Sequence, residues 1–448
     1  MKMNSLLFAA IVLAVLSGIL YWSNHRKPAE NAVKVSADAP PKILTLTQAD
    51  IAKVDIKKKS GDEVELAKND TGKWQIMGAK PLRADQNEVS SMLSTLSSLS
   101  SERLIEEKAG NLADYGLAQP AVEVDVTEKN NKTQKLLIGD NTPAGNAAYV
   151  ALSGDPRVFT LPNYSKTSLD KSAKDLRDKR LLVFEQDKLS RVELAAKKQD
   201  IEFGRNKEQW QIVKPKPLRA DDSKVEELIR KLGDAKMDLG ASDEDQKKAA
   251  AAFGSGTAVA TAKVTDASGT EELQVRKSKD DYYVKSSAVE GVYKVSSDFG
   301  TALDKSVDDF RNKKLFDFGF SDPEKIELHD GGKAYFLTKG GSDWFSADGK
   351  KVDAMGAEAL VGKVRDLTAS KFADSGFGTA EIEVTASSNG GKSVEKVLIS
   401  KDGDHYVAKR EGEPALYQLD PVVVMGLEKA AEDMKPVVEA KPEVPKKK

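Results

Sequence analysis

The sequence predicts an α+β protein in which one N-terminal transmembrane helix precedes three tandem repeats of a unit made of an antiparallel sheet and two helices. Three observations lead to this prediction. A block of residues recurs in the same order, the segments around it alternate polar and apolar residues, and the chain begins with a long uncharged run. The repeat carries most weight, because a missed repeat leads to the wrong fold.

The uncharged run extends from Ser5 to Trp22 and is followed by basic residues. As a helix it would be about 27 Å long, close to the roughly 30 Å of a hydrocarbon core. Because no small-residue cleavage site follows the run, we expect an anchor over residues 1–23 and not a cleaved signal peptide. The residues expected to hold the anchor in the bilayer are Leu6, Leu7, Phe8, Ile11, Val12, Leu13, Val15, Leu16, Ile19, Leu20, Tyr21 and Trp22.

The bulk of the chain is expected outside the cytoplasm, on a single-pass protein of the inner (cytoplasmic) membrane. Long domains are translocated largely regardless of flanking charge, so Arg26 and Lys27 do not decide the orientation. The chain has no cysteine, which excludes disulfides, thiolate metal sites and a lipid-modified cysteine and fits an oxidising compartment. Residues 24–43 are rich in proline and small residues and are expected to form a linker.

The recurring block joins a tryptophan to an aspartate. The first copy runs from Trp74 through Pro81-Leu82-Arg83-Ala84 to Asp85, the second from Trp210 through Pro217-Leu218-Arg219-Ala220 to Asp221, and a weaker third copy runs from Trp344 to Asp353. This period is far longer than the roughly 20–50 residues of a solenoid unit. Each copy is therefore domain-sized, and the chain divides into units at 44–184 and 185–317 and a divergent unit at 318–434. We expect the three tryptophans in the cores and not on a ligand platform.

A helix is predicted after each aspartate. In the first copy its apolar stripe comprises Val89, Met92, Leu93, Leu96 and Leu99, and the other copies repeat the spacing. Asp85, Asp221 and Asp353 stand where an N-cap belongs, and Glu88 is expected to complete a capping box. The Leu-Arg-Ala-Asp block could instead be a binding motif, but the cap explains its aspartate. We expect its arginines in local salt bridges.

The remaining segments of each unit predict strands and a second helix. Short alternating runs such as Val122-Glu123-Val124-Asp125-Val126 are separated by turn residues, which is typical of an antiparallel meander. A second helix is expected to end in Asp175–Leu181, and its counterpart in the second unit is expected to end in Asp309–Leu315. The Pro- and Lys-rich segment 435–448 is too polar to form a core and is expected to be a disordered tail.

Composition and motifs argue against most chemistry. The 69 Lys and Arg residues against 71 Asp and Glu give a net charge of −2, so nucleic acid is not an expected partner. His25, His329 and His405 do not have metal-ligand spacing, and the loop Gly139–Gly145 lacks the Lys-Ser/Thr of a P-loop. We therefore expect no catalytic, cofactor or metal residue, although a glycosidase-type pair of carboxylates stays open.

Several of these segments resemble one bacterial family. Trp74, Asp114-Tyr115-Gly116-Leu117, Leu137-Ile138-Gly139-Asp140 and the segment from Asp175 to Lys179 resemble the domain of unknown function 4340 (DUF4340). The resemblance is strongest in the first unit, moderate in the second and weak in the third. Similar proteins carry one N-terminal membrane helix and are often encoded beside ABC transporter subunits and a gliding-motility-associated auxiliary protein. The resemblance thus implies an accessory role in a membrane complex.

The function expected from these observations is that of a membrane-anchored, non-enzymatic accessory or scaffold subunit of an ABC-type transport or cell-envelope complex. It would bind the lipid bilayer through its N-terminal helix and protein partners through its repeats. The alternative is an extracytoplasmic module that binds a glycan or small ligand, and a hydrolase with scattered carboxylates is a third possibility. An aromatic-lined pocket would favour the second function, and a flat apolar patch would favour the first.

Overall fold

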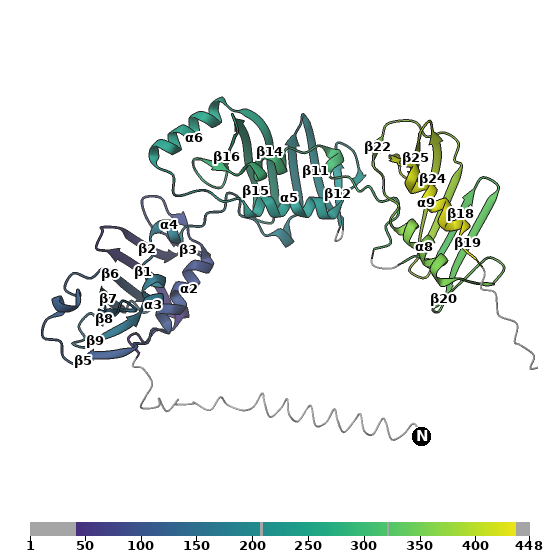
Figure 1. The fold of residues 1–448 in the computed structure, drawn as a ribbon. Coiled ribbons are helices and arrows are strands. Elements are labelled where there is room, and N and C mark those ends of the chain that lie inside the picture. The colour runs from purple at the N-terminus through teal and green to yellow at the C-terminus, as the bar shows by residue number, and fades with distance from the viewer. Residues whose placement is uncertain (1–41, 207–208, 320–321, 436–448) are drawn as a thin grey trace, which may run out of the picture. The chain divides into compact units, whose positions relative to one another are not determined.

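The computed structural model of the chain describes residues 42–206, 209–319 and 322–435. The chain divides into two compact units, Met1–Asp178 and Lys179–Lys448. The first unit contains one antiparallel sheet, and the second unit contains two, so the described residues hold three sheets of nine, eight and nine strands (Figure 1). Each sheet has a separate apolar core.

The described chain is mainly sheet, so the α+β prediction was wrong. The eight α-helices of the described residues are short, and the second helix expected in the first unit is reduced to two pieces of seven and four residues. Strands occupy most of each repeat, because the alternation of polar and apolar residues that favours strands extends over most of its segments. The antiparallel pairing itself is as the alternation predicts.

A membrane-spanning helix was part of the same prediction. Among residues 42–206, 209–319 and 322–435 no helix has both the length and the apolar character to cross a bilayer. The predicted anchor, residues 1–23, lies outside the described residues, as do most of the linker at 24–43 and the tail beyond residue 435.

The first sheet is an antiparallel meander whose strands have the order β4-β3-β2-β1-β6-β7-β8-β9-β5. The chain forms the first four strands, crosses the sheet with α2, and then adds the rest. The elements are β1 (Ile51–Lys58), β2 (Glu63–Lys68), β3 (Trp74–Ile76), β4 (Leu82–Arg83), α2 (Gln86–Ser97), β5 (Arg103–Glu106), β6 (Val122–Glu128), β7 (Thr133–Asn141), β8 (Ala147–Leu152), β9 (Val158–Pro162), α3 (Asn163–Leu169) and α4 (Ala173–Leu176).

The second sheet repeats this order without a counterpart of β5. A further helix, α6, follows α5 and contacts the last strands of the sheet. The elements are β10 (Arg191–Ala196), β11 (Gln199–Asn206), β12 (Gln209–Lys214), β13 (Leu218–Arg219), α5 (Asp222–Asp234), α6 (Asp243–Ser255), β14 (Thr257–Asp266), β15 (Gly269–Ser278), β16 (Asp281–Ser286), β17 (Val292–Val295) and α7 (Ser297–Leu303).

The third sheet has the order of the first. Its two helices, α8 and α9, lie side by side over one face of the sheet (Figure 1). The elements are β18 (Lys325–Asp330), β19 (Lys333–Gly340), β20 (Asp343–Phe345), β21 (Lys351–Val352), α8 (Ala354–Arg365), β22 (Lys371–Ala373), β23 (Ile382–Ser388), β24 (Ser393–Asp402), β25 (His405–Arg410), β26 (Leu416–Leu419) and α9 (Pro421–Glu432).

The core of each repeat lies between its sheet and the helix that follows the aspartate. The helix α2 buries the stripe predicted from its spacing, and α5 and α8 bury the same positions. These apolar side chains leave water together with the inward residues of the strands, which is the main source of stability for each repeat. The buried helix residues are Val89, Met92, Leu93 and Leu96 in α2, Val225, Leu228, Ile229 and Leu232 in α5, and Ala357, Leu360, Val361 and Val364 in α8.

Candidate functional site around Arg219

The three repeated tryptophans lie in the cores. Trp74, Trp210 and Trp344 stand on β3, β12 and β20, and their exposed fractions are 7%, 2% and 3%. In the first two repeats the backbone N–H of the tryptophan also donates to the side chain of the first residue of the following helix, Gln86 at 2.9 Å and Asp222 at 2.6 Å. The tryptophans thus fix the short strand to the helix and do not form a ligand platform.

The three repeated aspartates are N-caps. Asp85 accepts from the backbone N–H groups of Asn87 and Glu88 at 3.0 and 3.2 Å. Asp221 accepts from Ser223 and Lys224 at 3.1 and 3.4 Å, and Asp353 accepts from Gly356 at 2.7 Å, so all three satisfy N–H groups that the first helical turn leaves without partners.

The capping box predicted at Glu88 is wrong. The backbone N–H of Asp85, which such a box requires, donates to the carbonyl of Leu176 at 2.8 Å. The Glu88 carboxylate lies instead 3.7 Å from the Lys171 ammonium group. Reciprocal boxes do occur in the described residues, for example between Ser172 and Asp175.

The Leu-Arg-Ala-Asp block is held by the chain that returns after the second helix. In the first unit the amide of Asp178 donates to the Arg83 carbonyl at 3.0 Å, and in the second unit Asn312 donates to the Arg219 carbonyl at 3.0 Å. The amide of Asp221 completes the second pairing by donating to Phe310 at 2.8 Å. The repeated block is therefore one side of a short antiparallel ladder.

The returning segment of the second repeat continues into the third. Beyond Asn312, the carbonyl of Lys313 accepts from Ala369 at 2.9 Å, and the amide of Leu315 donates to Leu367 at 2.9 Å. Within a few residues the chain therefore leaves the β13 end of the second sheet and pairs with the segment that follows α8. Backbone bonds on both sides give this connection a defined path.

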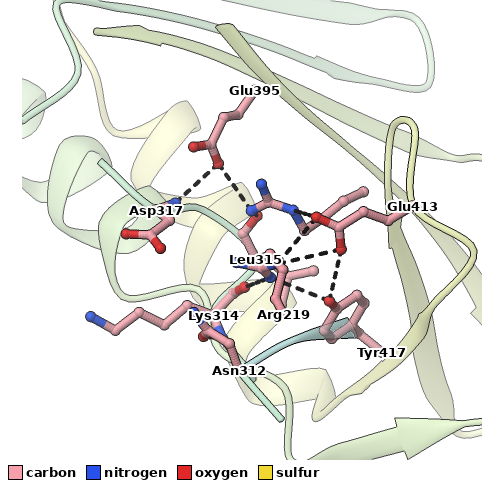
Figure 2. A network of polar contacts seen from close by, with 9 residues as sticks. Arg219, Asn312, Lys314, Leu315, Asp317, Glu395, Glu413 and Tyr417 are labelled. Carbon is pink, nitrogen blue, oxygen red and sulfur yellow. Dashed lines mark hydrogen bonds and ion pairs between the residues drawn. The ribbon is translucent and has the colours of Figure 1, made fainter. Parts of the chain in front are cut away.

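Arg219 is the centre of a polar network at this connection (Figure 2). Its Nε lies 3.1 Å from Glu413 Oε1, and its Nη2 donates to the Tyr417 hydroxyl at 3.2 Å and to the carbonyl of Lys314. The Tyr417 hydroxyl in turn donates to Glu413 Oε2 at 3.1 Å. One guanidinium from the second repeat thus meets a carboxylate, a phenol and a backbone carbonyl of the connection and the third repeat.

A second arginine extends the network. Arg410 donates through Nε to Glu413 at 2.8 Å and through Nη1 to Glu395 at 3.0 Å. The same Glu395 carboxylate accepts the backbone N–H of Asp317 at 3.0 Å. Two arginines and two glutamates therefore alternate around the connection between the sheets, and each charge has an opposite charge beside it.

The side chains of this network are more buried than those of ordinary surface ion pairs. The side chains of Arg219 and Glu413 are 22% and 26% exposed. Burial acts to lower the pKa of Arg219, but the facing Tyr417 hydroxyl and the Glu413 carboxylate outweigh it and raise the pKa, so the guanidinium stays charged. Burial raises the pKa of Tyr417, so the phenol stays neutral and can donate to Glu413.

The sequence predicted a local salt bridge for Arg219, and the structure corrects this to partners far along the chain. Tyr417 lies on β26 of the third repeat and Glu413 just before this strand, and no repeated motif marks them. The one signal in the sequence was the recurring segment Arg311–Leu315, which supplies the carbonyl of Lys314. The charged and polar groups of the network are directed at one another, which is the arrangement of a structural joint.

The glycines that resemble the family motif have a structural role in the first repeat. Gly116 has φ +68°, and a Cβ at Gly139 would lie 2.2 Å from the carbonyl oxygen of Tyr115. The ring of Tyr115 meets that of Tyr149 edge-on, with centroids 5.0 Å apart. The Asp-Tyr-Gly-Leu turn therefore packs directly on the Leu-Ile-Gly-Asp strand, around a small apolar cluster that includes Leu117.

The domain histidines stand apart from this network. His329 Nε2 lies 2.9 Å from Glu327, and His405 Nδ1 lies 3.0 Å from Asp404; His25 lies outside the described residues. Over the part of the chain that the structure describes, no three His, Asp or Glu side chains are grouped as metal ligands.

Comparison with known proteins adds a family. The model of the domain of unknown function DUF4340 matches residues 74–211 and again residues 210–388. Each match begins at the tryptophan of one repeat, Trp74 or Trp210, so the family unit starts within one sheet and includes the connection to the next. No curated protein and no solved structure matches the chain. Because the two matches together cover most of its length, the chain belongs to the DUF4340 family.

Proposed function

We propose that the chain is a non-enzymatic accessory or scaffold subunit of an ABC-type transport or cell-envelope complex at the cytoplasmic membrane. The observation that carries the proposal is the Arg219 network. A charged side chain of the second repeat that is mostly removed from water contacts side chains of the third repeat. A chain that holds repeated domains in a defined order can present several surfaces to protein partners.

The membrane location is supported by the sequence. The apolar run from Ser5 to Trp22 lies outside the described residues, and its length and flanks suit attachment to a bilayer. In this proposal the repeats lie outside the cytoplasm. Fractionation of cells with the full chain, followed by protease treatment of spheroplasts, tests both points. Recovery in the soluble fraction, or full protection of the repeats from protease, would contradict the proposed location.

Affinity purification of the full chain from detergent-solubilised membranes, followed by mass spectrometry, tests the partner. We expect ABC-type transport or envelope subunits to be enriched over an unrelated membrane bait. Arg219→Ala should reduce their recovery at a temperature where the chain remains folded. Arg365→Ala removes an arginine from an exposed pair with Asp322 and serves as the control.

If no such subunit is enriched, the proposed role is wrong. Equal recovery with wild type, Arg219→Ala and Arg365→Ala would show that the joint between the second and third repeats is not needed for assembly.

A further inference from the structure

A cavity of about 980 Å³ opens at one end of the second sheet. It lies where the turn between β10 and β11, the start of β14 and the end of β15 come together. Its lining includes Ala196 and Ala260, which are paired across β10 and β14 and are buried. This volume falls within the range of pockets that hold small ligands.

The rim of the cavity is basic. Four lysines line it, Lys197, Lys198, Lys277 and Lys279, against the two aspartates Asp200 and Asp304. The chain as a whole has a net charge of −2, so this is a local excess of positive charge. Among the described residues Lys197, Lys198 and Lys279 have no ion-pair partner, and their charges are available to a ligand.

Three of these lysines have backbone conformations that their side chains disfavour. Lys197, Lys198 and Lys279 have φ values of +49°, +60° and +57°. In this region a Cβ atom crowds the backbone, and glycine or asparagine is the usual residue. The other non-glycine residues with positive φ in the described chain are two asparagines, Asn131 and Asn389. Of the described residues with positive φ, those that are neither glycine nor asparagine thus all lie at this cavity.

The equivalent turns of the third sheet contain glycine where the second sheet has these lysines. The turn between β18 and β19 holds Gly331 and Gly332 at the positions of Lys197 and Lys198, and the turn between β24 and β25 holds Gly403 at the position of Lys279. Gly331 and Gly403 have φ values of +53° and +64°. Glycine thus takes the same left-handed conformation at the positions of Lys197 and Lys279, whereas Gly332, at the position of Lys198, does not have positive φ. The fold therefore does not require lysine at the positions of Lys197 and Lys279. Residues that strain a backbone without helping the fold point to a functional role.

We propose that this cavity binds a phosphate-bearing ligand. Ammonium groups act as compact point charges toward phosphate, and several of them converging on one cavity can share a phosphate with more than one negative charge. The ligand could be a soluble phosphate compound or the head group of a lipid, and both offer the same chemistry to the lysines. This inference does not depend on the scaffold role, because the cavity lies within the second sheet and not at the Arg219 network.

Isothermal titration calorimetry on the detergent-solubilised full chain tests the proposal. The probes are inorganic pyrophosphate for a soluble phosphate and sn-glycero-3-phosphoglycerol for a lipid head group, with citrate as a non-phosphate anion. We expect at least one phosphate probe to bind, and more tightly than citrate. The combined variant Lys197→Gly, Lys198→Gly and Lys279→Gly should weaken that binding by about tenfold or more. Its melting temperature should be unchanged or higher, because glycine suits these turns.

The matched control removes the same number of charges in the first unit, at the exposed residues Lys73, Lys129 and Lys132, each changed to serine. It should bind as the wild type does. The proposal is overturned if neither phosphate probe binds, if citrate binds equally well, if the glycine variant keeps wild-type affinity, or if the control loses as much affinity as the glycine variant.

Discussion

The residues at the start of α2, α5 and α8 differ in whether neighbouring residues explain their role. Asp85, Asp221 and Asp353 each follow a two-residue strand and accept N–H groups of the next helix. Their carboxylates need nothing beyond the first turn to explain them. The arginine two residues earlier differs, because Arg219 is explained only by residues of another repeat. Within one short block, one residue is thus local in its role and another is not.

Asp85→Ala should lower the free energy of unfolding of the first unit by about 0.5–2 kcal/mol, because two N–H groups lose their acceptor. Asp85→Asn should change it little, since asparagine caps a helix about as well. Chemical denaturation of the two variants measures the difference. If Asp85→Asn kept full stability but lost the co-purifying partners, the carboxylate would have a binding role that the cap does not explain.

Asp175 provides a prediction about pH. The Ser172 side chain and backbone donate to its carboxylate and hold the pKa of Asp175 below its ordinary value of 3.8. The depressed pKa stabilises the fold above pH 3.8, and this contribution is lost as the pH falls through the folded-state pKa. Ser172→Ala should raise the pKa toward 3.8, as followed by NMR titration of the carboxyl carbon. An unchanged pKa in this variant would show that the backbone N–H alone sets it.

Strands and turns show why the family motif has its glycines. The Asp-Tyr-Gly-Leu turn lies against β7, and the contact of Gly139 with the Tyr115 carbonyl leaves no room for a side chain. The third repeat has a related contact, because a Cβ at Gly376 would lie 2.2 Å from the Asp402 carboxylate. In the second repeat α6 takes the place of this turn and of the edge strand. The Asp-Tyr-Gly-Leu motif therefore indicates a sheet whose last strands are covered by this turn.

Gly139→Ala should destabilise the first unit by about 1–3 kcal/mol, because the added methyl group meets a backbone oxygen and the turn must move. Gly110→Ala is the control, since a Cβ there meets nothing within 4 Å and the residue does not have positive φ. Thermal melts of the two variants measure the effect. Equal melting temperatures would mean that the turn and β7 separate without cost.

The segments that connect the repeats contribute residues to the cores of the sheets. Each of the three sheets has its own core. Leu181 and Leu182 precede β10, the first strand of the second sheet, and their side chains belong to the core of that sheet. The connecting segments thus supply buried side chains and form backbone hydrogen bonds, and they are not simple spacers. The compact units of the chain divide between Asp178 and Lys179, while the predicted unit boundaries near residues 184 and 317 stay predictions.

The fragment 179–317 should show a cooperative thermal transition, and the shorter fragment 185–317 should be markedly less stable. Loss of a buried leucine side chain costs about 2–5 kcal/mol, and the shorter fragment lacks both Leu181 and Leu182, which are 0% and 1% exposed. Calorimetry of the two fragments measures the difference. Equal stability would show that these leucines contribute only within the full chain.

Arg219 and Glu413 should be coupled in a double-mutant cycle. We expect about 1–2 kcal/mol between Arg219→Ala and Glu413→Ala, above the roughly 0.2–1 kcal/mol of exposed pairs, because both side chains are mostly buried. Arg365 and Asp322, at 51% and 41% exposed, form the control cycle and should fall in the lower range. A coupling no larger than the control would mean that the network does not hold the two repeats together.

The sequence by itself determined the repeat, the antiparallel strands, the stripes of α2, α5 and α8, and the caps at their starts. These features depend on the period of apolar residues and on side chains that act on their own turn, so neighbours in the chain suffice to predict them. The family resemblance was likewise visible in the residues that shape one turn and one strand.

Only the tertiary structure decided the balance of sheet and helix, the partners of Arg219 and the site formed by the lysines. Glu413 lies 194 residues from Arg219 in the chain, and the basic cavity draws on three turns and strands that are separate in sequence. Local periodicity predicts which face of a helix or strand is apolar, but not which distant element packs against that face. The packing partner depends on strand pairing and side-chain fit across the whole repeat, so the candidate sites could be identified only from the folded chain.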